Sequence, residues 1–461
     1  MAPFFTNDAV VLGILLVVLA VIFHTSSLKT PGWKKFYTYV PGLLLAYFVP
    51  ALLNWPLGLI APHWYDSGLY DLLSQYNLTM PGGLSYDNIT VFLSENGVPA
   101  EEYKSLQRHS QLYFVASRYL LPASLVLLCL GIDFKGLIGL GSKALIMFFT
   151  ATAGIIMGGP IALLIISWLF PNLIGGNPED IWRGLSTVAG SWIGGGANQT
   201  AMKEIYEVGD NLFGTMIVVD VVVANIWMGF LLYGANISDR IDEWFKADNS
   251  AIEDLKNKVA DYRASIEQMP TTTTLFVLMA VAFGGVSLSH WGADVITPWM
   301  TGFKETLNNL RLNSLMSHFF WLIVISTTLG MSLALTKARK MEGIGASRWG
   351  SIFIYILVAT IGMKMNLGEV FNNLGLFAVG ICWMLVHVIT LLFVGKLIKA
   401  PFFFVAVGSQ ANVGGAASAP IVASAFSPSL APVGVLMAVL GYALGTYGAI
   451  ICATLMQIVS S

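Results

Sequence analysis

The sequence predicts an all-α membrane protein that crosses the bilayer many times. Of its 461 residues, 56% are hydrophobic and only 11% are charged, whereas an ordinary soluble domain carries about 25% charged residues. About a dozen apolar runs recur along the chain, and each approaches the roughly 20 residues that span a bilayer as a helix. The 46 glycines are a third indication, because glycine in membrane helices permits close helix contact or a helix break.

The other totals exclude several function classes. Lys plus Arg (24) nearly balances Asp plus Glu (26), so no basic surface for nucleic acid is expected. Three cysteines are scattered in apolar runs, which favours buried packing residues over a metal or redox motif. The sequence contains no phosphate-binding P-loop, no GxSxG and no HExxH motif, so we expect neither an enzyme nor a cofactor.

The chain divides into six predicted regions. The run from Asp8 to Ser27 is followed, not preceded, by lysines, which favours a retained helix with an outer N-terminus over a secretory signal. The regions are N-terminal transmembrane helices at 1–53, an external loop at 54–112, a first repeat at 113–235, a charged linker at 236–270, linking transmembrane helices at 271–336 and a second repeat at 337–461. In the linker, apolar residues from Ile252 to Met269 alternate at spacings of three and four. They predict an amphipathic helix that packs on the membrane domain or on a partner subunit.

Internal repetition is the most informative pattern. The string GSWIGGGANQTA at 190–201 has a counterpart, GSQANVGGAASAP, at 408–420, and long apolar runs flank both strings in the same order. The distribution of Lys and Arg predicts that the two halves are inverted in the membrane. Twelve crossings would instead make them parallel, so eleven or thirteen are expected. The suspect segment is 271–290, which contains two adjacent glycines and a histidine.

Both glycine strings predict a broken helix, the first within 184–205 and the second within 402–426. A lipid-facing helix cannot give up its backbone hydrogen bonds, so each break requires surrounding protein or a water-filled cavity. Free N–H groups at a break attract anions, and free carbonyl groups attract cations. Two breaks meeting near the membrane midplane predict a transport site, whereas close packing of small residues is the alternative for either string alone.

The candidate residues for binding substrate or ion lie at these breaks and just after the first one. They are Ser191, Gly194, Gly195, Asn198, Gln199, Thr200, Asp220 and Asn225 in the first half, and Ser409, Gln410, Asn412, Gly414, Gly415 and Ser418 in the second. Asp220 is included because a charge at mid-bilayer costs about 2.5–3.5 kcal/mol and is therefore a functional candidate. It can carry a proton or bind Na⁺, and a hydrogen-bonded structural aspartate is the alternative. No dedicated metal site is predicted; a coupling Na⁺ would use the same residues.

Further polar residues lie near these segments. Lys203 and Glu204 close the first string and are expected at the cytoplasmic mouth of the site. Tyr442, Thr446 and Tyr447 are expected to flank the second site. His387 lies within an apolar run and is expected to be a hydrogen-bonded packing residue.

Five strings resemble the domain of unknown function 819 family of bacterial and plastid membrane proteins. They are GGGANQTA, VVDVVVANIW, ATIGMKMNL, GSQANVGGAASAP and LMAVLGYALGTYG, and the resemblance extends from about Leu128 to the C-terminus. It implies membership of the cation/proton antiporter and anion transporter superfamily, with two crossed discontinuous helices in a core domain beside a scaffold domain. It also implies a homodimer, elevator-type movement of the core, and location in a bacterial inner membrane.

The predicted function is secondary active transport of a small polar or anionic solute, coupled to H⁺ or Na⁺ by symport or antiport. One alternative is a cation/proton antiporter without an organic substrate. The other is a membrane receptor or scaffold that transports nothing. The expected partners are the solute or ion, the lipid bilayer and a second copy of the chain.

Overall fold

The computed structural model describes residues 3–40, 42–80, 86–132, 140–171, 173, 177–247, 269–309, 313–365, 375–427 and 430–460. The chain forms two compact units. Unit 1 comprises Met1–Ser117 with Tyr355–Leu367, and unit 2 comprises Arg118–Ile354 with Gly368–Ser461. The predicted amphipathic linker helix and its apolar seam lie outside the described residues, except for Met269, which is exposed.

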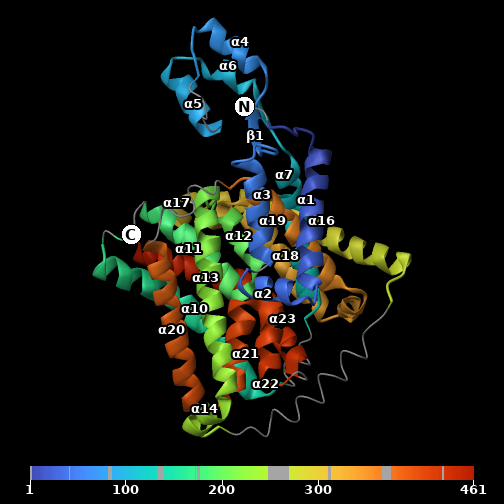
Figure 1. Ribbon diagram of the computed structural model, residues 1–461, viewed down its shortest axis with the longest axis vertical. Helices are drawn as coiled ribbons and strands as arrows, with labels where there is room; N and C mark the ends of the chain where they lie inside the picture. The colour runs from blue at the N-terminus through green and yellow to red at the C-terminus, as the bar shows by residue number, and fades with distance from the viewer. Residues whose placement is uncertain are drawn as a thin grey trace. The chain divides into compact units, whose positions relative to one another are not determined.

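Helices dominate the chain (Figure 1). Within the described residues, seven helices are long and apolar enough to cross a bilayer, or eight if a sharply bent pair forms one span. The seven are α1 (Asp8–Ser27), α7 to α8 (Leu112–Leu130, with the π-helical turn η1 at Ala116–Leu120), α10 (Ser142–Leu169), α13 (Asp210–Asn236), α16 (Thr272–Thr301), α20 (Gly375–Leu397) and α23 (Ala431–Val459). The bent pair is α18 (His318–Ala334) and η3 (Lys337–Ile344). The prediction of a polytopic, helical membrane protein is confirmed.

Shorter helices account for the remaining apolar runs and the connections. Those in apolar runs are α3 (Gly42–Asn54), α11 (Pro178–Gly194), α12 (Gly196–Ile205), α19 (Ala346–Gly362), α21 (Phe402–Val413) and α22 (Gly415–Phe426). The connecting helices are α2 (Pro31–Tyr39), α14 (Ser238–Phe245), α17 (Lys304–Asn309) and η2 (Asn313–Met316). Each of the apolar runs found in the sequence therefore contains a helix.

Helix α16 contains the segment 271–290, which the sequence marks as a doubtful span. It is one continuous helix of 30 residues, capped at its start by the Thr271 hydroxyl, which accepts from Thr274 N. Its adjacent glycines do not break it, because helical hydrogen bonding continues through them. Figure 1 shows α16 running across the direction of α13 and α20. Its length permits a crossing and its direction differs from theirs, so the number of crossings stays a prediction.

In unit 2, α10 packs on α20 in the antiparallel sense. A Cβ atom added at Gly154 would lie 3.3 Å from the His387 ring, and one added at Gly158 would lie 2.6 Å from the Trp383 ring. From Gly154 to Gly158 the residue number rises along α10, while the number of the contacting residue on α20 falls from 387 to 383. Trp383 Nε1 also donates a hydrogen bond to the carbonyl of Ile155, at 2.8 Å. Glycines on α10 thus make room for the large side chains of α20.

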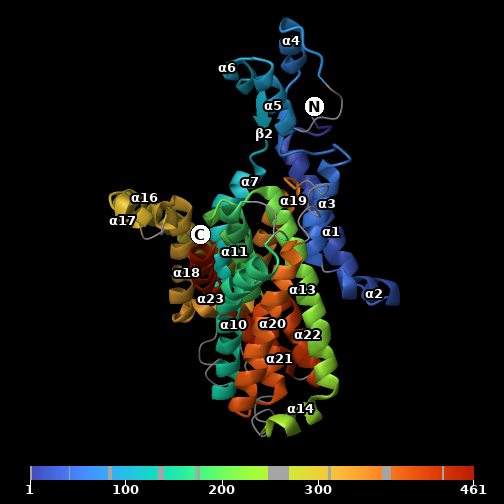
Figure 2. The ribbon, with the colours of Figure 1, turned by 90° about the vertical axis from the view of Figure 1, so that its left-hand side faces the viewer.

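The other two long helices of this group run parallel to one of these. Helix α23 runs parallel to α10. Ile156 lies against Gly448, and further along both helices Gly159 lies against Cys452 and Met456. Helix α13 runs parallel to α20. Val219 contacts Gly380, and further along both helices Trp227 of α13 and His387 of α20 bond to the same residue, Ser409. Figure 2 shows α10, α13 and α20 side by side along their length.

The stretch predicted as an external loop contains a small folded module in unit 1. Strand β1 (His63–Tyr65) pairs antiparallel with β2 (Gln107–His109), and α4 (Gly68–Gln75), α5 (Tyr86–Glu95) and α6 (Ala100–Lys104) gather around them (Figure 2). Its apolar core consists of Tyr65, Leu69, Leu72, Leu73, Ile89, Leu93, Val98 and Tyr103. The description as a loop was incomplete, because short apolar groups far apart in sequence form this core only when the strands pair.

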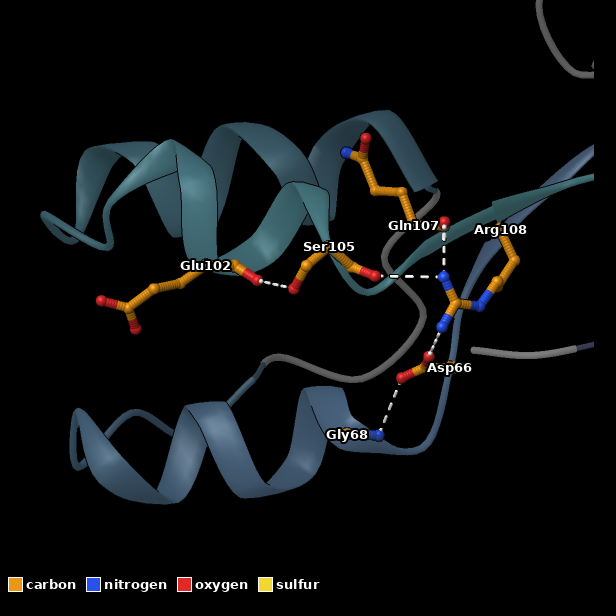
Figure 3. A network of polar contacts seen from close by, with 6 residues as sticks. All are labelled: Asp66, Gly68, Glu102, Ser105, Gln107 and Arg108. Atoms are coloured by element: carbon orange, nitrogen blue, oxygen red, sulfur yellow. Dashed lines mark hydrogen bonds and ion pairs between the residues drawn. The ribbon is translucent and has the colours of Figure 1, made fainter.

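A polar network fastens the two strands to α4 (Figure 3). The Asp66 carboxylate accepts from Arg108 Nη2 at 2.7 Å and from the backbone N–H of Gly68 at 3.0 Å. Arg108 also donates to the Ser105 carbonyl, at 3.0 Å. Asp66 therefore joins the start of α4 to β2 through one side chain.

We expect Asp66→Ala to loosen this module without unfolding the protein. Losing a helix-start contact and a partly exposed ion pair should cost about 1.4 kcal/mol, which corresponds to a roughly tenfold loss of protection against hydrogen exchange. The measurement is amide exchange of residues 63–109 in the full-length protein. Asp71→Ala, an exposed change on the same helix, is the control, and equal protection in both variants would contradict the assignment.

Candidate functional site

The first predicted break is present at the predicted glycines. Helix α11 ends at Gly194 and α12 begins at Gly196. Between them Gly195 has φ 78° and ψ −172°, a conformation that side-chain-bearing residues rarely adopt. Its N–H donates to the Ser191 carbonyl, and its own carbonyl accepts from the N–H groups of Asn198 and Gln199. Glycine is therefore required here to turn the chain between two half-helices.

The second break lies at the corresponding glycines. Helix α21 ends at Val413, α22 begins at Gly415, and Gly415 has a φ of 58°. The Gln410 side chain spans this break, because its Nε2 donates to the Ser418 hydroxyl on α22 at 2.6 Å. Its other amide atom, Oε1, is buried and accepts no hydrogen bond from any described residue. The second break thus carries a buried acceptor that no described residue uses.

The two breaks meet at Gly441 of α23. A Cβ atom added there would lie 2.6 Å from the Ile193 carbonyl oxygen and 3.5 Å from that of Ala411. In a continuous helix each of these oxygens would accept from the N–H four residues later, but those N–H groups lie beyond the breaks. The C-terminal ends of α11 and α21, where the helix dipole concentrates partial negative charge, therefore converge on one glycine.

Each break also contains one buried asparagine whose amide is fully engaged. Asn198 donates to the carbonyls of Gly194 (3.0 Å) and Tyr442 (3.3 Å), and its Oδ1 accepts from the Thr446 hydroxyl at 2.6 Å. The first break is thereby tied to α23. Thr446 was expected beside the second site, but its side chain binds the first.

Asn412 plays the matching part at the second break. Its Nδ2 donates to the carbonyls of Gly408 (3.0 Å) and Phe148 (3.3 Å). Its Oδ1 accepts from the Thr152 hydroxyl at 2.8 Å. The second break is therefore tied to α10, as the first is tied to α23.

Asp220 of α13 holds both sides of the first break. Its Oδ1 accepts from Trp192 Nε1 on α11 at 2.7 Å, and its Oδ2 accepts from Gln199 Nε2 on α12 at 3.0 Å. The residue is only 5% exposed. No ion pair within the described residues includes Asp220. A buried carboxylate with only neutral donors favours a proton or a cation as its partner.

Ser409 connects three helices beside the second break. Its Oγ accepts from Trp227 Nε1 of α13 at 2.8 Å and lies 2.8 Å from His387 Nε2 of α20. His387 Nδ1 lies 3.1 Å from the Ala151 carbonyl, which can only accept. We therefore assign the proton of the neutral ring to Nδ1, so that the Ser409 hydroxyl donates to Nε2. His387 is buried and hydrogen-bonded, and it contacts a predicted site residue.

Three predicted residues make only local or peripheral contacts. The Thr200 hydroxyl donates to Gly196 O and the Asn225 amide to Val221 O, each within its own helix. Lys203 is buried and lies 3.0 Å from Asp210 and 3.5 Å from Glu204. Lys203, Glu204 and Asp210 form an ion cluster that joins α12 to the start of α13, and the position of Lys203 and Glu204 at a cytoplasmic mouth stays a prediction.

Sequence reasoning missed Trp192, Trp227, Thr152 and Gly441 as parts of this region. Trp192 lies inside the first glycine string, and its indole N–H was the available signal. The other three lie in long apolar helices, where nothing local distinguishes them.

A family model described as "Protein of unknown function (DUF819)" matches residues 103–459. The chain belongs to the DUF819 family. The matched region contains both breaks of this DUF819 protein, as well as α10, α13, α20 and α23. The chain is also similar to YjcL, an uncharacterized membrane protein of Bacillus subtilis (strain 168), with 23% identity over 346 residues that cover 73% of this chain and 82% of YjcL. The family resemblance predicted from the glycine strings is confirmed.

Proposed function

We propose that this DUF819 protein is a secondary active transporter that moves a small polar or anionic solute coupled to Na⁺ or H⁺. The observation that carries the proposal is the meeting of the two helix breaks at Gly441, where carbonyls of Ile193 and Ala411 converge. Half-helix ends of this kind bind ions and solutes in secondary transporters. Asp220, with its neutral hydrogen-bond donors, supplies the charge for the coupling ion.

The packing of the long helices supports inverted repeats. The order α10, α11, α12, α13 recurs as α20, α21, α22, α23. Corresponding helices of the two halves run in opposite directions. Helix α10 is antiparallel to α20. Because α13 is parallel to α20 and α23 is parallel to α10, α13 is antiparallel to α23. This is the relation expected for repeats of inverted topology, which is the class of fold implied for the cation/proton antiporter and anion transporter superfamily.

In this mechanism the two kinds of half-helix end bind different partners. The converging carbonyls, Gln410 Oε1 and the Asp220 carboxylate favour a cation, while the N-terminal ends of α12 and α22 favour an anionic group of the solute. Superfamily membership would further make the protein a homodimer in a bacterial inner membrane, in which a core moves against a scaffold in elevator fashion. The dimer, the membrane location, the division into core and scaffold, and the elevator movement are all part of the proposal.

Two other functions make different predictions. A cation/proton antiporter would use Asp220 and the carbonyls for cation and proton alone, without an organic solute. A receptor or scaffold would use the external loop, which contains the folded module at residues 63–109, or the predicted helix from Ile252 to Met269 as its working surface. It would need no free acceptor at Gln410. Among the described residues, Asp220 is the one carboxylate that the hydrogen bonds described above join to a break, which favours solute transport over the antiporter.

The test is flux into proteoliposomes under an imposed Na⁺ or pH gradient. Candidate solutes are first selected by thermal-shift screening with and without Na⁺. Gln410→Leu removes the amide at the second break with little change in volume, and should lower flux by about tenfold, the effect of losing one buried polar contact of about 1.4 kcal/mol.

Ser424→Ala on α22, whose hydroxyl donates only to Ile421 O of its own helix, is the matched control. Flux of cations against protons without any organic solute would favour the antiporter. No gradient-driven flux of any tested ion or solute would leave the scaffold function standing.

A further inference from the structure

An apolar groove runs between α13 and α20, which lie side by side (Figure 2). Its volume is about 290 Å³. The lining side chains are all apolar or aromatic: Val223, Ile226, Trp227 and Phe230 from α13, and Ile381, Met384, Leu385 and Val388 from α20. None of the polar candidate residues at the two helix breaks is part of this lining.

Trp227 connects this groove with the second break. Its ring lines the groove, while its Nε1 donates to Ser409 of α21 at 2.8 Å. Ser409 also binds His387 of α20. An occupant of the groove therefore contacts the side chain that helps to hold the second broken helix.

The surroundings identify the chemistry of the occupant. Both helices are long and apolar enough to cross a bilayer, and the rim of the groove is apolar, with Phe230 63% and Leu385 56% exposed. In a membrane these rim residues face hydrocarbon. A polar solute would leave its hydrogen-bonding groups unsatisfied there, whereas a hydrocarbon chain has no such groups.

We propose that an acyl chain of a bilayer phospholipid occupies the groove between α13 and α20 and packs against Trp227. A flexible, unbranched hydrocarbon matches both the volume, which lies near the lower limit for ligand pockets, and the apolar lining. The influence of this lipid on transport rests on the proposed function, whereas its binding does not.

Photolabelling in nanodiscs tests the binding. The full-length protein is reconstituted in palmitoyl-oleoyl phosphatidylcholine containing an analogue with a diazirine near the end of one acyl chain, and labelled residues are located by mass spectrometry. We expect labelling of the groove residues well above that of Val17 on α1, which is 63% exposed and represents ordinary lipid contact.

Val388→Phe should reduce groove labelling by about tenfold, because the added ring overfills the groove. Ile381→Phe fills it from the exposed rim and guards against a folding defect in the first variant. Ile389→Phe, at a neighbouring position that is 65% exposed and does not line the groove, should leave labelling unchanged. Trp227→Phe should retain labelling, because an aromatic ring still lines the groove, but should lower transport, because the bond to Ser409 is lost.

Three results would overturn the proposal. Equal labelling of the groove and of Val17 would mean ordinary lipid contact only. Unchanged groove labelling in both filling variants would place the lipid elsewhere. Crosslinking between two copies through cysteines introduced at the groove would identify it as a protein interface.

Discussion

Asp220→Asn is expected to lower gradient-driven transport strongly while the protein remains folded. The carboxylate accepts from Trp192 on one side of the first break and from Gln199 on the other. Asparagine has nearly the same shape but neither carries a charge nor takes up a proton. We expect flux to fall by about 10- to 100-fold, the range given by the 1.5–3 kcal/mol typical of hydrogen bonds to charged groups.

Folding should survive because the new amide can be accommodated. Its oxygen can accept from Trp192 Nε1, and its NH₂ group can donate to Gln199 if the Gln199 amide rotates to present its oxygen. The variant should therefore elute as a single species and unfold within a few degrees of the wild-type protein. Loss of flux would then report on charge, not on packing.

Asp294→Asn is the matched control, since Asp294 is exposed on α16 and pairs with His318. Flux is measured in proteoliposomes under Na⁺ and pH gradients for wild type and both variants. Full gradient-driven flux in Asp220→Asn would remove Asp220 from the coupling role. An inactive wild-type protein, by contrast, would count against transport itself, so the two failures are distinguishable.

The position of Asp220 also suggests how ion binding is transmitted. Its two oxygens hold Trp192 of α11 and Gln199 of α12, so one carboxylate joins both half-helices. Neutralising it by a proton or a cation would weaken its hold on both. Gln410 joins α21 to α22 across the second break in a similar way. Each break is thus closed by a polar side chain, and under the proposed function the coupled ion would compete for these bonds.

The sequence located the helices and both breaks because the signals are local. An apolar run of about 20 residues has few alternatives in a membrane, and the positive φ values of Gly195 and Gly415 need glycine. Asp220 was identifiable because a charge inside such a run is costly. These three kinds of signal can be read from a few neighbouring residues.

Contacts between distant residues could not be predicted. Thr446 binds Asn198, which lies in the other half of the chain, and Gly441 touches carbonyls from both halves. The folded module in the predicted loop could not be predicted for the same reason. Strand β1 pairs with β2 across three short helices, so the two strands lie far apart in sequence. Tertiary packing, not local pattern, determines all three.

Alanine at Gly445 or Gly441 is expected to destabilise the protein, although glycine-to-alanine changes usually stabilise helices. A Cβ atom at Gly445 would lie 2.5 Å from the Cα of Gly194 and 2.5 Å from the Asn198 amide, and one at Gly441 would lie 2.6 Å from the Ile193 carbonyl. Because backbone atoms on the first break cannot yield as a flexible side chain can, α23 must move away from it. Overpacking of this kind costs about 1–3 kcal/mol.

The controls should show the opposite sign. Gly229 on α13 and Gly284 on α16 have no atom of a described residue within 4 Å of an added Cβ, so alanine there should stabilise by up to about 1 kcal/mol through helix propensity alone. Thermal unfolding of the four purified variants distinguishes the two groups. Unchanged or raised stability in both Gly441→Ala and Gly445→Ala would mean that α23 does not pack tightly on the first break. Because the candidate binding site depends on that packing, the same result would count against a fixed meeting point of the two broken helices. Lowered stability accompanied by lost flux would instead link the meeting point to transport.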